Sequence, residues 1–160
     1  NKYGNRVCFA RGVYPELNEK YDLLLEKFSG TKVRTDKKQK QTFCDSKMLK
    51  SILQRLGFIG NVYEKRIPSW VYSSNDLIKQ AFLQGLIDSD GSSNIDEWNC
   101  ERFSIELTNE QLIKDIKMLC QTLGWKSGKI GTRHRLIKQP FKDGRMIKTN
   151  HRSWYFYFYN

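Results

Sequence analysis

Apolar residues recur at helical spacing in two segments of the chain. In the first segment they occupy positions i, i+4, i+7, i+8 and i+11, which are Leu17, Tyr21, Leu24, Leu25 and Phe28. In the second segment the same spacings are occupied by Leu112, Ile116, Leu119, Cys120 and Leu123. These spacings gather the apolar side chains on one side of a helix, so each segment is predicted to be an amphipathic helix whose apolar face packs on a core.

The two predicted helices lie within the same order of elements. A predicted strand precedes each helix, and a glycine and a basic predicted strand follow it, within residues 5–35 and again within residues 101–133. Leu17 and Leu112 match at an offset of 95 residues. Several elements that recur in one order indicate an internal duplication. We therefore expect one repeat in residues 1–74 and a second in residues 75–160.

Polar and apolar residues alternate in residues 102–108, which predicts a strand with one face on the core. Phe103, Ile105 and Leu107 would face the helices, whereas Arg102, Ser104, Glu106 and Thr108 would face outward. Residues 154–159 are mostly aromatic, and their strong β propensity predicts another strand. The predicted fold class is α+β, with helices on one face of curved antiparallel sheets and a polar, basic opposite face.

The net charge of the chain indicates which class of partner it binds. The chain of 160 residues has 28 Lys and Arg against 17 Asp and Glu, a net charge of +11. This excess favours nucleic acid over a membrane surface or an acidic protein, because basic residues release the counterions of a phosphate backbone. A basic sheet can lie in the major groove and reach base edges. The residues predicted to bind DNA are Arg34, Lys38, Lys40, Lys129, Arg133 and Arg135.

The cysteines and the apolar runs suggest no other class of protein. The four cysteines form no CxxC pair and the chain has two histidines, so reduced, buried thiols are expected rather than a zinc site. No apolar run is as long as a membrane span, and no segment resembles a signal peptide. An intracellular protein, cytoplasmic or nuclear, with no membrane partner is expected.

The sequence LQGLIDSDG, residues 83–91, ends a further predicted helix, and SSND, residues 73–76, forms a capping-box pattern at its start. Gly85 lies inside this helix, where glycine costs about 1 kcal/mol relative to alanine. The cost is understandable if another backbone approaches closely there. Asp88 and Asp90 lie at the C-terminal end, where their charge opposes the helix dipole. A bound divalent cation would remove this conflict, and hard oxygen ligands suit Mg²⁺.

Residues 83–91 resemble the defining motif of the LAGLIDADG homing endonucleases, with Gln84 and Ser89 in place of two alanines. The preceding EKRIPSWV, residues 64–71, is similar to the Lys-x-Ile-Pro block of the endonucleases embedded in inteins. With the flanking repeats, the resemblance covers nearly the whole chain. It implies duplicated αββαββα repeats whose two motif helices pack side by side through small residues, here Gly85 and Ala81.

The resemblance also implies a catalytic set. Asp90 would bind Mg²⁺ or another divalent cation, which polarises a phosphodiester and activates a water. Lys65 would act as a base or meet the charge that develops on the phosphate. Glu106 would be the third catalytic residue, with Asn109 as the alternative.

The function that follows is a site-specific endonuclease that makes a Mg²⁺-dependent break in double-stranded DNA by phosphodiester hydrolysis. Placement within an intein is preferred, and an intron-encoded enzyme is the nearest alternative. A hypothesis from another class is a non-cleaving nucleic-acid binder, either an RNA maturase or a DNA-binding regulator. The presence of Asp90, Lys65 and Glu106 favours catalysis.

The repeat offset predicts that parts of a complete enzyme are missing. Shifted back by the offset, Asp90 falls before residue 1, and shifted forward, Lys65 falls at or past residue 160. Ala10 or Arg11 stands where the first repeat would have its equivalent of Glu106. The chain is then a piece of a two-motif enzyme, a unit that takes its second motif helix from another copy, or a degenerate relative. It opens at Asn1 and ends at Tyr159-Asn160, without the terminal residues of a splicing domain.

Overall fold

The computed structural model describes residues 4–11, 15–36, 41–58, 60–140 and 146–159, with the backbone alone in 135–140 and 146–151. The chain divides into two compact units, Asn1–Ile59 and Gly60–Asn160. This division lies before the 64–71 block, whereas our sequence boundary at residues 74 and 75 followed it. The block lies in the second unit because its side chains contact a helix of that unit, as described below. No helix in the described ranges combines the length and the hydrophobicity that a membrane span needs.

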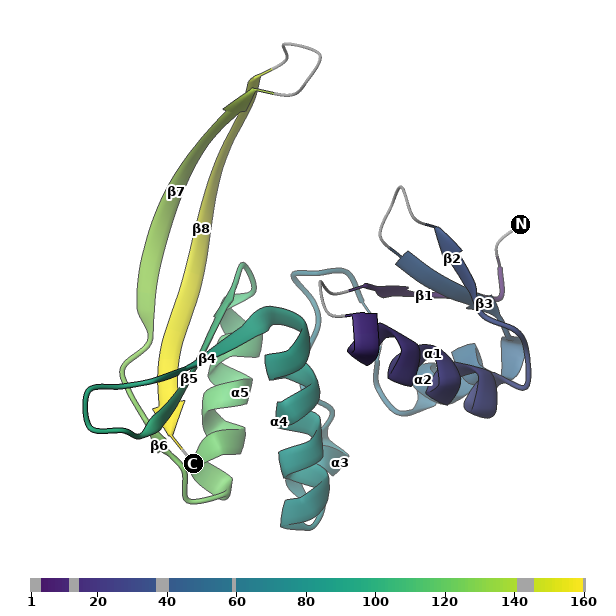
Figure 1. The fold of residues 1–160 in the computed structure, drawn as a ribbon, viewed down its shortest axis with the longest axis horizontal. Coiled ribbons are helices and arrows are strands. Elements are labelled where there is room, and N and C mark those ends of the chain that lie inside the picture. Colours follow the sequence, from purple (N-terminus) through teal and green to yellow (C-terminus); the bar gives the residue numbers. More distant parts are fainter. Residues whose placement is uncertain (1–3, 12–14, 37–40, 59, 141–145, 160) are drawn as a thin grey trace. The chain divides into compact units, whose positions relative to one another are not determined.

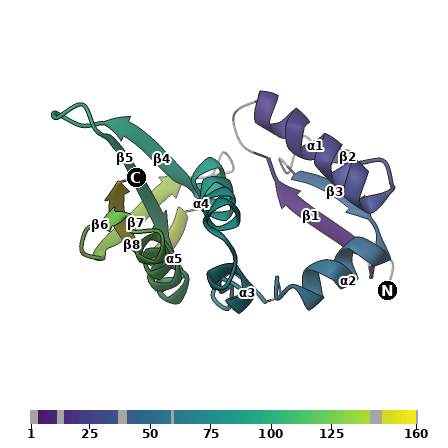
Figure 2. The ribbon, with the colours of Figure 1, turned by 90° about the horizontal axis from the view of Figure 1, so that it is seen from below.

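The first unit consists of one antiparallel sheet and two helices (Figures 1 and 2). Its described elements are β1 (Arg6–Ala10), α1 (Pro15–Ser29), β2 (Arg34–Asp36), β3 (Gln41–Asp45) and α2 (Lys47–Arg55). The strand order is β1-β3-β2. Helix α2 begins at a good cap, because the Ser46 side chain accepts a hydrogen bond from the Leu49 amide at 3.2 Å.

The second unit contains the predicted motif helix and a larger antiparallel sheet. Its described elements are α3 (Ser69–Tyr72), α4 (Asp76–Asp90), β4 (Gly91–Ile95), β5 (Glu101–Leu107), α5 (Glu110–Thr122), β6 (Lys126–Ser127), β7 (Gly131–Pro140) and β8 (Met146–Tyr159). The strand order is β4-β5-β8-β6, and β7 also pairs with β8. Figure 1 shows β7 and β8 continuing together as a long ribbon beyond the rest of the sheet.

The core of the second unit lies between α4, α5 and one face of this sheet. Ile105 of β5 is buried, as the alternation in residues 102–108 predicted, and Phe156 and Phe158 of β8 are buried beside it. The helices contribute Leu83, Ile87, Ile113, Ile116, Leu119 and Cys120. Full burial of each large apolar side chain contributes roughly 1.5–3 kcal/mol. The predicted α+β class, with helices on one face of antiparallel sheets, is confirmed.

The elements of the two units correspond as a duplication would require. The first residues of β1 and β5 are 95 residues apart, and so are the first residues of α1 and α5. The order β1-β3-β2 matches β5-β8-β7, with the last strand of each trio in the middle. The assignment of residues 1–74 and 75–160 as repeats stays a prediction, which these correspondences support.

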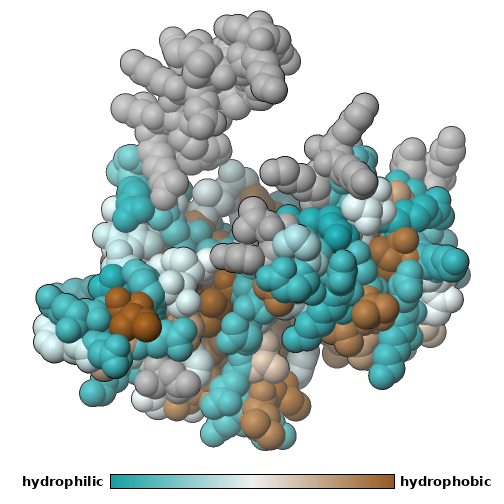
Figure 3. All heavy atoms as spheres, in the orientation of Figure 1, coloured by the Kyte–Doolittle hydropathy of each residue, from teal (hydrophilic) through white to brown (hydrophobic). Residues whose placement is uncertain are grey.

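Several local predictions differ from the structure. The apolar stripe of α1 is largely exposed, with Tyr21, Leu24 and Phe28 at 39%, 40% and 63% exposure, and Figure 3 shows hydrophobic colour over this helix. The cap of α4 is Asn75 rather than the Ser73 of the sequence pattern, because residues 69–72 already form the short helix α3.

The cysteines are free thiols, two of them buried and two exposed. Burial raises the pKa of the Cys44 thiol, and it raises the pKa of Cys120 to about 12. Cys8 and Cys100 are exposed, so the expectation of buried thiols is wrong for this pair. Cys8 lies on β1 of the three-stranded sheet and Cys100 directly precedes β5.

Candidate functional site

Helix α4 delivers Asp90 to the edge of the second sheet without an intervening loop. Asn75 starts the helix by accepting the Ile78 amide at 3.0 Å, and Asp90 is its last residue. β4 then begins at Gly91, where a Cβ atom would lie 2.7 Å from Ile87 Cα and 3.1 Å from the Ser104 carbonyl oxygen. Glycine is therefore needed for so tight a passage from helix to strand.

A cavity of about 230 Å³ opens beside Asp90 on the sheet. Its lining residues come from the end of α4 and from β4, β5, β7 and β8: Asp90, Gly91, Ser92, Ser104, Ile105, Glu106, Arg133, Tyr155 and Tyr157. Two predicted catalytic residues, Asp90 and Glu106, thus line one cavity, together with the predicted DNA contact Arg133. The cavity combines negative and positive charge on an otherwise polar sheet face.

Glu106 is held by two donors across neighbouring strands. Arg133 Nη1 donates to Glu106 Oε2 at 2.9 Å, and Ser153 Oγ donates to Glu106 Oε1 at 2.6 Å. The Arg133 guanidinium also lies 4.8 Å from the centre of the Tyr155 ring. That ring has room because position 131 is glycine, where a Cβ atom would lie 2.6 Å from Tyr155 Cζ. The carboxylate and the guanidinium are accordingly preorganised.

The donor set of the cavity suits Mg²⁺, which needs few protein ligands, better than a metal that is bound by protein ligands alone. Asp90 is exposed, and its Oδ2 accepts a hydrogen bond from the Ser89 hydroxyl at 3.2 Å. In the part of the chain that the structure describes, no three His, Cys, Asp or Glu side chains gather as metal ligands. Two carboxylates beside an open cavity match Mg²⁺, which usually keeps several waters and binds one or two carboxylates plus substrate phosphates.

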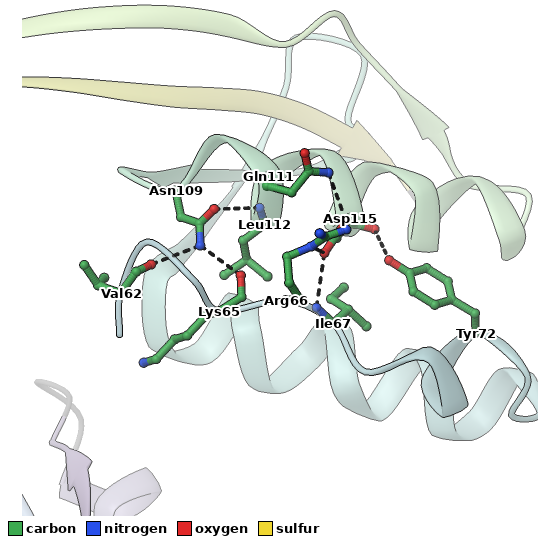
Figure 4. Close-up of polar contacts among 9 residues, drawn as sticks. All are labelled: Val62, Lys65, Arg66, Ile67, Tyr72, Asn109, Gln111, Leu112 and Asp115. Carbon is green, nitrogen blue, oxygen red and sulfur yellow. Dashed lines mark hydrogen bonds and ion pairs between the residues drawn. The ribbon is translucent and has the colours of Figure 1, made fainter. Parts of the chain in front are cut away.

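Lys65 lies in the same unit, on the segment that runs along α5 (Figure 4). Asn109 is the N-cap of α5, and its Nδ2 donates to the carbonyl oxygens of Val62 and Lys65 at 3.0 and 2.9 Å. The Lys65 side chain is exposed and extends away from these bonds. Lys65 does not line the cavity. Asn109, the alternative to Glu106, is buried and faces this segment instead.

The rest of the block is fixed by Asp115, which is 3% exposed. Its carboxylate accepts from Arg66 Nε and Nη2 at 2.6 and 2.9 Å and from the Ile67 amide at 3.2 Å. This charge-assisted fork raises the pKa of Arg66. The Tyr72 hydroxyl donates to the Asp115 carbonyl oxygen at 3.1 Å, and burial, aided by the Asp115 charge, raises the pKa of Tyr72 to about 12.

The other predicted DNA contacts lie in both units, and several fall outside the described residues. Arg34 lies on β2 of the first unit, where it donates to Asp45 at 3.2 Å with a side chain 66% exposed. Hydrogen bonding from Arg6 and the charges of Arg6 and Arg34 lower the pKa of Asp45. Lys129 is exposed just before β7. The Arg135 backbone lies in β7, opposite His151. The Arg135 side chain, Lys38 and Lys40 lie outside the described residues.

The predicted helix interface is exposed. Ala81 and Gly85 lie on the same side of α4 as Leu77, which is 77% exposed. A Cβ atom on Gly85 would meet nothing within 4 Å among the described residues. Among the described residues of the second unit, no helix packs against Gly85, and the expected second motif helix stays a prediction.

The first repeat lacks a carboxylate where the second has Glu106. Arg11, 95 residues earlier, is oppositely charged and donates to Asp22 at 2.6 Å and to Thr35 at 3.2 Å. The described residues of this repeat therefore do not reproduce the acidic cavity at the matching position.

Residues 77–139 match the family model described as LAGLIDADG-like domain. The match runs from α4 into β7, so it includes Asp90, Glu106 and Arg133, and it leaves out Lys65. It supports assignment of this segment to the LAGLIDADG family.

The similar proteins are much longer than this chain. An iron-sulfur cluster assembly SufBD family protein of Mycobacterium leprae (strain TN) is 31% identical over 110 residues, which is 68% of this chain and 12% of that protein. A DNA gyrase subunit of the same organism is 31% identical over 61 residues, 38% of this chain and 5% of the gyrase protein. The chain thus spans a small fraction of the length of either relative.

Proposed function

We propose that this chain is part of a site-specific DNA endonuclease of the LAGLIDADG class. The observation that carries the proposal is the cavity on the sheet that is lined by Asp90, at the end of the motif helix, and by Glu106 and Arg133. The family match across these residues supports it, as does the net charge of +11. Proteins of this family bind DNA, and the proposed substrate is double-stranded DNA.

Each residue has a distinct part in the proposed hydrolysis. Asp90, with Glu106 beside it, would hold Mg²⁺, which when bound polarises a phosphodiester and lowers the pKa of a water. Arg133 donates to Glu106 and offsets the charge of the two carboxylates, and it would also contact a DNA phosphate. Lys65, which lies outside the cavity lining, would meet negative charge as it develops on the phosphate.

We propose further that the segment is an inserted element, of the kind found in inteins. The two relatives carry unrelated names, yet each resembles this chain over a small fraction of the relative's own length. A mobile segment inserted into different host proteins accounts for that pattern. The Lys-x-Ile-Pro block at Lys65 supports the same placement.

A non-cleaving nucleic-acid binder is the second candidate. The observation that favours it is the pairing of Arg11 with Asp22 where the first repeat would need its acidic counterpart. A double-strand break requires chemistry on both strands, and one acidic cavity serves one strand. A second motif helix, from the same protein or another copy, would complete the endonuclease, whereas a maturase or regulator would not need it.

The test uses the complete reading frame around this segment and a plasmid that carries the uninterrupted host gene. We expect Mg²⁺-dependent linearisation that is lost in Asp90→Asn. Asp88→Asn is the matched control, because Asp88 accepts from Gln84 at 2.7 Å along the helix and does not line the cavity. Salt-sensitive binding without cleavage by any variant would favour the non-cleaving binder.

A further inference from the structure

The segment that carries Lys65 is held by helix α5 rather than by secondary structure of its own. Asn109 donates to the carbonyl oxygens on either side of residues 63 and 64, and Asp115 accepts from Arg66 and from the Ile67 amide. Figure 4 shows these bonds on one side of the segment, with the Lys65 side chain leading away from them. The position of the Lys65 backbone is therefore set by α5.

Asn109 links this segment to the strand that lines the cavity. Glu106 lies three residues before it, a span of at most about 10 Å in extended chain. The same side chain caps α5, because Oδ1 accepts from the Leu112 amide at 2.9 Å. One amide group thus fixes the start of α5 with its oxygen and the Lys65 segment with its nitrogen.

We propose that Asn109 is a positioning residue for Lys65, an inference that rests on the proposed endonuclease function. Both Nδ2 protons are used, one on Val62 and one on Lys65. Asn109 is 5% exposed, so water has little access to take the place of its side chain in these bonds. Loss of the two bonds would free the segment without removing the Lys65 ammonium. A misplacement of about 1 Å can lower a rate by roughly 100-fold, even when the mutation lies far from the chemistry.

Substitution of Asn109 by Asp separates the two uses of the side chain. Aspartate caps a helix as well as asparagine does, and its charge suits a helix N-terminus. It cannot donate, and it places an oxygen against two carbonyl oxygens. Asn75→Asp is the matched control, since Asn75 caps α4 through its Oδ1 and, among the described residues, makes no bond through Nδ2.

The experiment measures single-turnover cleavage of the uninterrupted host-gene plasmid and the dissociation constant for the same DNA in Mg²⁺-free buffer. We expect Asn109→Asp to cut about 10- to 100-fold more slowly, with its dissociation constant within about threefold of the wild-type value, and Asn75→Asp to cut at the wild-type rate. Adding Asn109→Asp to Lys65→Ala should slow cleavage no further, because the effect passes through Lys65. Amides 63–67 should exchange hydrogen faster in Asn109→Asp alone.

Three results would overturn the inference, and each has a different meaning. Equal cleavage by Asn109→Asp and Asn75→Asp would show that Asn109 serves as a cap only. A further loss in the Lys65→Ala background would show a general structural effect. If the wild-type protein binds this DNA and does not cut it, the proposed function fails as well, whereas the first two results leave that function standing.

Discussion

At the scale of single residues, the Tyr72 hydroxyl shows how the end of α3, directly after the 64–71 block, is tied to helix α5. It donates to the Asp115 carbonyl oxygen at 3.1 Å, and its pKa is raised to about 12. An unfolded tyrosine ionises near pH 10. Between these two values the unfolded state releases its proton first, so this residue makes the folded protein lose stability as the pH rises.

We predict that Tyr72→Phe lowers the free energy of unfolding by about 1 kcal/mol at pH 8, the contribution of one hydrogen bond. The deficit should shrink as the pH rises from about 10 toward 12, because phenylalanine has no proton to release. Urea unfolding at pH 8 and pH 11 measures both values. Tyr63→Phe, at a position 63% exposed, is the control. A deficit that is the same at both pH values would contradict a raised pKa for Tyr72 in the folded protein.

The sequence identified part of the cavity residue by residue. Asp90 and Glu106 could be proposed because the motif and the alternation of β5 point to them. Tyr155 and Tyr157 were missed, although the alternation in the last strand, which buries Phe156 and Phe158, already placed these tyrosines on the outward face. The pairing of Arg133 with Glu106 depends on the register Arg133↔Ser153 and Glu106↔Tyr155, which no local pattern specifies.

At the scale of elements, the passage from α4 to β4 depends on Gly91, whereas Gly85 is dispensable for the helix itself. We predict that Gly91→Ala lowers the free energy of unfolding by about 1–3 kcal/mol, because its Cβ would meet the Ile87 backbone at 2.7 Å. Gly85→Ala should raise it by up to about 1 kcal/mol, since nothing described lies within 4 Å. Denaturant unfolding measures both. Similar destabilisation by the two substitutions would refute this distinction.

Gly85 also tests the helix interface apart from stability. If a second motif helix packs there in the complete enzyme, Gly85→Ala should reduce cleavage while it stabilises this chain. Unchanged cleavage would argue against the packing.

The elements themselves were largely predictable, because helical stripes and strand alternation are local patterns. The stripe of α5 is buried or half-buried throughout, as predicted. The equivalent stripe of α1 is not, since burial depends on what lies opposite and the sequence of one helix does not specify that. The β8 strand extends eight residues before the predicted start at Trp154, because its pairing with β7 continues to Met146.

At the scale of the whole molecule, the two units have very unequal cores. The buried cluster that includes Leu83, Ile116 and Phe156 lies entirely within residues 67–158. In the described part of the first unit, the buried apolar side chains are Cys44 and Leu49. Small units bury a lower fraction of their surface and are correspondingly marginal.

We therefore predict that residues 60–160 fold alone with a cooperative thermal transition, whereas residues 1–59 alone show little cooperative structure. Circular dichroism during heating measures both fragments, and the full chain provides the reference. A fragment of residues 60–160 that fails to fold would show that its core needs the first unit.

The position of β8 has a consequence for how the chain is made. β8 follows every other described strand of its sheet in the sequence, yet it lies between β5 and β6 and also pairs with β7. On the ribosome, α4, β4 and β5 can associate early through their local contacts. The sheet cannot close until β8 emerges with Phe156 and Phe158. The second unit thus stays open for nearly the whole of its synthesis, and its folding is timed by the arrival of this central strand.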